Sequence, residues 1–162
     1  MKSKPPETTS EAGRIAQLLR HAFDGGAWHG PAVLELLDDI DACTAAAKPL
    51  PHVHSIWELV LHIAVWDAAA VTRLGGSKCQ PTGVVNFPLV PKVNDASWRK
   101  AISATKRTHD ILVKTVAGLP DSRLRDRVPG KRYDVYHMLH GIAQHELYHA
   151  GQIAILRKAG LR

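Results

Sequence analysis

Near its C-terminus the chain carries apolar residues at alternating spacings of three and four, the pattern of an α-helix that buries one face. The buried positions of this pattern are Val135, Met138, Ile142, His145, His149, Gln152 and Leu156. Two histidines therefore occupy positions where a helix core calls for leucine or isoleucine. A polar group buried without a partner costs about 1–3 kcal/mol, so the fold has to satisfy each imidazole.

His145 and His149 are four residues apart, so they lie one above the other on one face of the predicted helix and can converge on one metal ion. The alternative is a pair of core histidines that hydrogen-bond to neighbouring groups. The segment His145-Glu-Leu-Tyr-His149 also matches H-E-x-x-H, the signature of zinc peptidases. Zincins usually take their third ligand from downstream, and none of the 13 residues after His149 is His, Asp, Glu or Cys. We therefore predict that the protein is not a zincin peptidase.

A third ligand has to come from elsewhere, and His62 is the best candidate because it lies within the apolar run 59–66. Without the other two histidines, His62 would be interpreted as a core residue whose imidazole is hydrogen-bonded within the fold. Three imidazoles with an open position resemble catalytic metal sites, since structural zinc sites close with a fourth protein ligand. Glu58, Gln152 and Asp67 are candidates to accept a hydrogen bond from the ring nitrogens that do not face the metal. Glu58 also completes a capping box with Ser55, and that role alone accounts for it.

Helical periodicity dominates the rest of the chain, and we find no strand alternation and no internal repeat. Helices are predicted over 10–23, from Pro31 to the segment 49–51, over 55–75, from Asn94 or Asp95 through Val116, and over 134–159. Long connections are expected at 75–94 and 120–132. The pattern predicts an all-α four-helix bundle with a short extra N-terminal helix, forming a single domain over 10–162 after a disordered N-terminus at 1–9.

The net charge of +6, from 21 Lys and Arg against 15 Asp and Glu, raises the question of a nucleic-acid partner. Basic residues gather in the segment 123–132, but Asp121 and Asp126 dilute them and no aromatic residues interleave them for base stacking. We expect a solvated face and no nucleic-acid partner, with attraction of a small anionic substrate left open.

Membrane insertion and secretion are also not expected. The most apolar run, 59–71, is too short to span a bilayer and is interrupted by His62 and Asp67. The opening segment MKSKPPETTS has no apolar core of the kind that a signal peptide needs. Two cysteines, Cys43 and Cys79, cannot build a disulfide framework. We therefore expect a cytoplasmic protein with no membrane partner.

Three segments, 23–37, 55–76 and 136–159, resemble the DinB-like/YfiT-like metalloenzyme family of damage-inducible four-helix-bundle proteins. The resemblance rests on the spaced histidine pair followed by Gly-Gln-Ile and on an earlier histidine in a Trp-rich helix, and it extends over about residues 11–160. It implies an up-down-down-up bundle, often a homodimer, with nickel or zinc bound by three histidines. By matched motif position these ligands are His62, His145 and His149.

Some members of the resembling family are transferases or isomerases that use a low-molecular-weight thiol such as bacillithiol, mycothiol or glutathione. The resemblance thus implies a divalent-metal-dependent enzyme that activates a thiol or a water for attack on a small electrophilic substrate, with the 75–94 loop as a wall of its pocket. One alternative is a non-catalytic metal-binding or stress-response module of the same fold. Another is a bundle whose histidines are satisfied internally and bind no metal.

Overall fold

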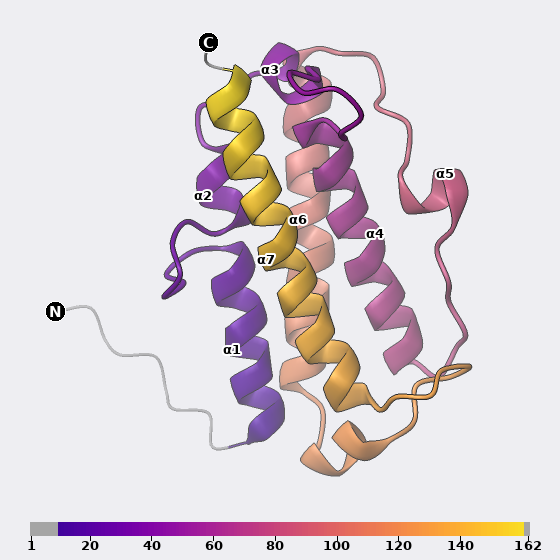
Figure 1. Cartoon of the computed structure of the whole chain (residues 1–162). Coiled ribbons are helices and arrows are strands. Elements are labelled where there is room, and N and C mark those ends of the chain that lie inside the picture. Colours follow the sequence, from indigo (N-terminus) through magenta and orange to yellow (C-terminus); the bar gives the residue numbers. More distant parts are fainter. Residues whose placement is uncertain (1–9, 161–162) are drawn as a thin grey trace, which may run out of the picture.

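A computed structural model describes residues 10–160, and this part of the chain is all-helical, as predicted (Figure 1). The predicted disorder at 1–9 lies outside the described residues. The elements in chain order are α1 (Glu11–Phe23), α2 (Val33–Leu37), α3 (Ala42–Ala46), α4 (Ile56–Leu74), α5 (Gly83–Asn86), α6 (Asp95–Ala117), the 3-10 helix η1 (Asp121–Arg125) and α7 (Val135–Gly160). No helix in the described range is long and apolar enough to cross a membrane.

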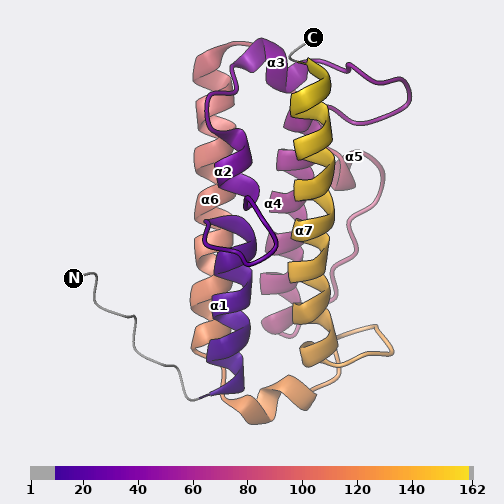
Figure 2. The ribbon, with the colours of Figure 1, turned by 60° about the vertical axis from the view of Figure 1, so that its left-hand side comes forward.

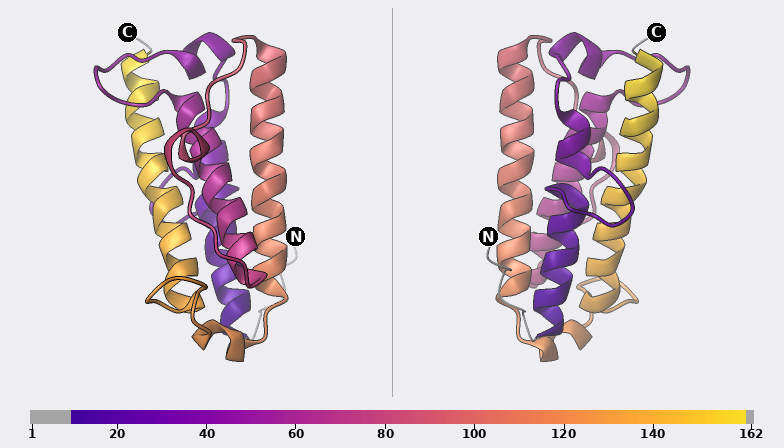
Figure 3. Two further views of the ribbon diagram at one scale, coloured as in Figure 1. Left: turned by 90° about the vertical axis from the view of Figure 1, so that its right-hand side faces the viewer. Right: turned by 90° about the vertical axis from the view of Figure 1, so that its left-hand side faces the viewer.

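The four longest helices, α1, α4, α6 and α7, lie side by side along one common axis (Figures 2 and 3). α4 packs against both α6 and α7, and α1 packs against the same two helices from the other side. The colours of Figure 1 show that α1 and α7 run in one direction and α4 and α6 in the other. α4 and α6 are parallel because the segment 75–94, which includes α5, returns along the outside of the bundle from the end of α4 to the start of α6.

The helical stretch predicted from Pro31 to the segment 49–51 is two short helices, α2 and α3, and Pro31 lies before the first of them. The chain breaks between them at Asp39, whose φ of 63° is left-handed and incompatible with a continuing helix. Asp41 then starts α3 by accepting a hydrogen bond from the Thr44 amide at 2.7 Å. α1, predicted as a short addition to the bundle, packs along α6 and α7 and takes one corner of it.

The start of α4 confirms the predicted capping box. The Ser55 hydroxyl accepts the Glu58 amide at 3.2 Å, and the Glu58 carboxylate accepts the Ser55 amide at 2.7 Å. α6 begins in the same manner at Asn94, which accepts the Ser97 amide at 2.9 Å. The segment 120–132, predicted as a loop, contains η1. These caps fix where the long helices begin and therefore which of their residues face inward.

The core consists of two apolar clusters, one in each half of the bundle. The first surrounds Trp57 and Trp98 and includes α2 and the C-terminal half of α7, whereas the second surrounds Leu112 and Leu139 and includes α1. Between the two clusters along α4, α6 and α7 lies a layer of buried polar residues, Asp67, His109 and Glu146. The histidines on α4 and α7 lie at the same height of the bundle, on the side that faces α5.

Candidate metal centre

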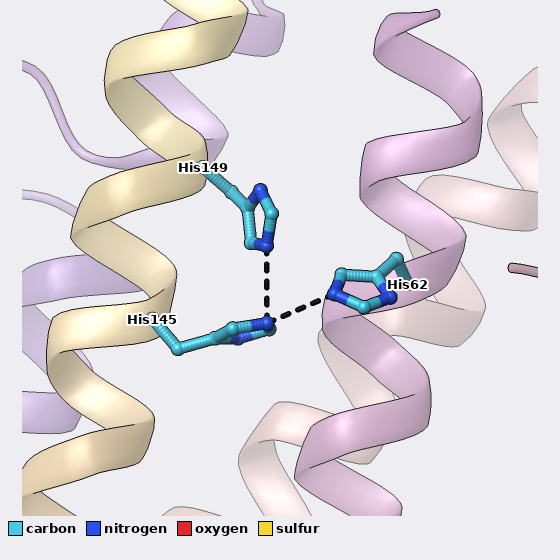
Figure 4. Close-up of side chains that lie close together, drawn as sticks. All are labelled: His62, His145 and His149. Carbon is cyan, nitrogen blue, oxygen red and sulfur yellow. Dashed lines mark hydrogen bonds between the residues drawn. The ribbon is translucent and has the colours of Figure 1, made fainter. Parts of the chain in front are cut away.

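The three predicted histidines come together between α4 and α7 (Figure 4). Nε2 of His145 lies 2.9 Å from Nε2 of His62 and 3.0 Å from Nε2 of His149. His62 and His149 are buried, and His145 is half-buried. The capped start of α4 and the i, i+4 spacing on α7 therefore direct three imidazoles to one point.

The hydrogen-bond partners of Nδ1 in His62 and His149 determine which nitrogen of each ring carries the hydrogen. Nδ1 of His62 lies 2.8 Å from the main-chain oxygen of Asn86, and Nδ1 of His149 lies 2.6 Å from Oε1 of Gln152. Since these oxygens can only accept, both Nδ1 atoms are the donors. Nε2 of each ring is consequently left with a free lone pair that points at His145.

His145 completes a group of three nitrogens that fits a cation. A neutral His145 can give one hydrogen from Nε2, which satisfies only one of its two neighbours. Its Nδ1 is buried and has no hydrogen-bond partner among the described residues. Three neutral imidazoles that share at most one hydrogen at their meeting point form the donor set of a divalent transition ion, so the residues present fit a metal.

The environment of the three rings keeps them neutral. Burial lowers the pKa of His145 to about 3, and the nearby His149 and His62 would repel a charge there as well. Burial is also the main cause that lowers the pKa of His62 and of His149. Neutral imidazole is the form that binds a metal, so at neutral pH all three side chains are in the ligating state.

The segment 75–94 supports His62 from behind. Asn86, at the end of α5, accepts the ring N–H of His62 with its main-chain oxygen and the indole N–H of Trp66 with its side chain, the latter at 2.9 Å. Phe87 stacks on the His62 ring at 4.0 Å between centroids. The segment was predicted to wall the pocket, but none of its residues lines the cavity described next. Its contacts instead fix the orientation of one ring.

A cavity of about 420 Å³ lies between α4 and α7, and the three histidines form part of its wall. Its other lining residues include Trp66, Arg73, Tyr133, His137, Met138, Ile142 and Tyr148. The volume lies within the range of about 300–1,000 Å³ that is usual for small-molecule sites. The histidines therefore face a space that a small ligand can enter.

The three residues predicted to support the ligands lie in different places. Gln152 is the acceptor for His149, as its position on α7 suggested. Glu58 is not the acceptor for His62; its carboxylate caps α4 and pairs with Lys48 at 3.0 Å. Asp67 lies in the buried polar layer. The acceptor for His62 was missed because Asn86 comes from a loop, and no sequence pattern connects it to α4.

The buried polar layer is a second group whose donor atoms lie close enough to hold an ion, all within 4.8 Å of one another. Nδ1 of His109 lies 3.3 Å from Asp67 Oδ2 and 3.0 Å from Glu146 Oε1, and the three side chains are completely buried. Burial raises the pKa of Glu146 to about 8. Burial would lower the pKa of His109, but hydrogen bonding to the two carboxyl groups and their charges raise it to about 9. This group is enclosed in the core, whereas the three histidines present bare nitrogens beside a cavity.

A protein-family model matches the greater part of the chain. The sequence model of the DinB superfamily matches residues 27–153, a range that contains all three histidines. No curated protein and no solved structure gives a significant match to the chain.

Proposed function

The chain belongs to the DinB superfamily, and on that premise we propose that it is an enzyme that depends on one divalent transition metal held by His62, His145 and His149. The observation that carries the proposal is the meeting of three Nε2 atoms, two of them without a hydrogen, in the wall of a cavity. Hydrogen bonds alone cannot satisfy that arrangement, but an ion does.

Three imidazole nitrogens suit nickel or zinc, and we propose one of these two as the resident metal. When bound, such an ion lowers the pKa of a thiol or a water and holds it as the thiolate or the hydroxide. The protein keeps the three rings neutral by burial and fixes two of them through Asn86 and Gln152. Such supporting contacts normally set the orientation and basicity of metal-binding histidines.

The lining of the cavity favours a thiol over a water as the activated group. Trp66, Met138 and Ile142 make much of the wall apolar, and no Asp or Glu of residues 10–160 lines it. Such apolar surroundings suit a thiolate, whose soft sulfur binds nickel or zinc well and is less strongly hydrated than a hydroxide. We propose a transferase or isomerase that uses a low-molecular-weight thiol to attack a small electrophile.

Two measurements on protein purified without a histidine tag test the proposal in sequence. Elemental analysis should find one nickel or zinc ion per chain, and its absence after metal reconstitution would contradict the metal site. Calorimetry with bacillithiol, mycothiol and glutathione should then show that one of them binds the metal-loaded protein and not the His149→Ala variant. Binding followed by turnover with a panel of electrophiles would establish the enzyme.

Metal without metal-dependent thiol binding or turnover would instead identify a non-catalytic metal-binding module. A matched control for the elemental analysis is His137→Ala. His137 lines the same cavity but lies outside the group of three histidines, so this variant should retain its metal.

A further inference from the structure

Arg73 is a cation in the wall of the cavity, at the C-terminal end of α4. Its side chain is almost completely buried, with a relative exposure of 3% for the whole residue. Within the described part of the chain no carboxylate lies within 4.0 Å of its guanidinium. Buried charges are normally paired, because removing one from water without a counter-charge is costly. An unpaired arginine that lines a cavity therefore points to an anion that enters it.

The hydrogen bonds of Arg73 leave part of the guanidinium free for such a ligand. Nε and Nη2 both donate to the main-chain oxygen of Cys79, at 3.0 Å and 2.8 Å. A guanidinium has five N–H groups, so these two bonds fix its orientation and leave the others available. Two parallel N–H groups match the oxygens of a carboxylate or a phosphate, which is why arginine is preferred at sites that bind them.

Trp66 connects Arg73 to the histidines. The guanidinium carbon lies 5.4 Å from the centroid of the Trp66 ring, and the Trp66 ring lies 5.8 Å from the His145 ring. The two distances place the guanidinium carbon no more than about 11 Å from the His145 ring. The Asn86 side chain holds the Trp66 indole in place. The wall thus presents a fixed cation and the three Nε2 atoms at a separation that one small molecule can bridge.

Positive charge also lies beside the cavity. A shallow groove lined by Arg125, Arg127 and Arg132 shares Tyr133 and His137 with the cavity. Asp134 compensates part of this charge, since its carboxylate lies 4.0 Å from Arg125. These exposed arginines favour the approach of an anion at low salt, whereas the buried Arg73 is placed to hold it.

We propose that the cavity binds a small molecule that carries an oxyanion, a carboxylate or a phosphate, and that Arg73 is the residue that holds this group. The inference deepens the proposed function, since it names the chemical class of the thiol or electrophile that the site takes. Arg73 determines specificity in this arrangement and takes no part in bond making. The ligand spans from Arg73 past Trp66 to the histidines, so its anionic group and its reactive atom are only a few bonds apart.

The test compares two thiols of equal length, 3-mercaptopropionate and the neutral 3-mercaptopropionamide, by calorimetry on the metal-loaded protein. The carboxylate should bind the native protein more tightly than the amide. Arg73→Gln should weaken binding of the carboxylate by roughly tenfold to a hundredfold, the scale of a charge-assisted pair, and leave the amide within about twofold. Arg73→Lys retains the charge and should recover part of the loss. Arg125→Gln is the matched control, because it removes a nearby exposed charge.

Equal binding of the two thiols to the native protein would overturn the inference without any variant, so it does not depend on whether Arg73→Gln folds. Equal losses of affinity for the carboxylate in Arg73→Gln and Arg125→Gln would also overturn it. They would show that the general positive charge of the surface, and not Arg73, is responsible for the binding. A parallel titration of metal-free protein with inorganic phosphate separates this inference from the proposed function. Phosphate binding that is lost in Arg73→Gln supports the oxyanion site even if no thiol binds the metal-loaded protein, whereas its persistence in that variant contradicts the site.

Discussion

Oε1 of Glu146 lies 3.0 Å from Nδ1 of His109 in the core, although Glu146 directly follows His145 in the sequence. Consecutive residues of a helix point about 100° apart, so two neighbours can belong to different sites. The glutamate of the H-E-x-x-H match therefore faces away from the cavity, and it is not among the residues that line it. Glu146 therefore does not occupy the position from which the glutamate of a zinc peptidase activates water.

Replacing Glu146 with Gln should leave the metal content of the protein unchanged, because the carboxyl group contacts His109 and not the three histidines. It should lower the free energy of unfolding by about 1–3 kcal/mol, the usual cost of disturbing a buried polar contact. Chemical denaturation and elemental analysis measure the two effects, with the half-buried Glu11→Gln as control. Peptide cleavage that disappears only in Glu146→Gln would contradict this assignment.

Single alanine substitutions of the three histidines should separate ligands from neighbours. His145→Ala and His149→Ala should abolish metal binding, and His62→Ala should weaken it severely, since each removes one of three donors. Competition with a coloured chelator measures the affinities. An unchanged affinity in any of the three variants would remove that residue from the proposed site.

Gln152→Ala should weaken metal binding by roughly tenfold to a hundredfold, because the His149 ring loses the acceptor that fixes its orientation. The chain offers a close control in Gln144, which lies on the same helix but is exposed. Gln144→Ala should bind metal as the native protein does. Equal affinities for the two variants would show that Gln152 does not support His149.

Metal affinity should remain constant as the pH falls to about 6.5 and decrease only at lower pH. Free histidine titrates near pH 6.5, but burial lowers the folded-state pKa of His62, His145 and His149. Protons therefore compete with the metal only below the ordinary histidine range. A titration of affinity from pH 8 to pH 4 checks this, and a midpoint at or above 6.5 would contradict burial of the ligands.

The same pKa shifts predict the stability of the metal-free protein. Below pH 6.5 the unfolded chain binds protons at these three histidines that the folded chain does not, so the free energy of unfolding decreases as the pH falls below 6.5 and does not depend on these groups above it. The contribution of His109 to stability changes with pH in the opposite direction. Its folded-state pKa of about 9 lies above the unfolded value, so its contribution is present below pH 6.5 and is lost as the pH rises through 9. His149→Ala should reduce the acid-side loss of stability and leave the alkaline side unchanged.

The sequence predicted well where burial and helical period act together. The clustering of His62, His145 and His149 was predicted because each occupies an apolar helix position, and the Ser55 cap of α4 follows from local chemistry. Two features could not be predicted in this way. The break at Asp39 depends on one left-handed residue within a stretch of otherwise helical composition. The Asp67, His109 and Glu146 layer joins three helices, and each of its residues, taken alone, resembles an ordinary polar residue on a helix.

The return of the chain from α4 to α6 gives the site an unusual dependence on a connecting segment. Asn86 selects the tautomer of His62, yet it belongs to neither helix that carries the histidines. An insertion on either side of α5, or a proteolytic cut there, would release that carbonyl while α4 and α7 remain packed. The His62 ring could then turn, and its hydrogen could move to the nitrogen that the other two histidines need bare. The length of this crossover is thus a point at which the affinity of the site can change in evolution or by engineering while its three histidines stay the same.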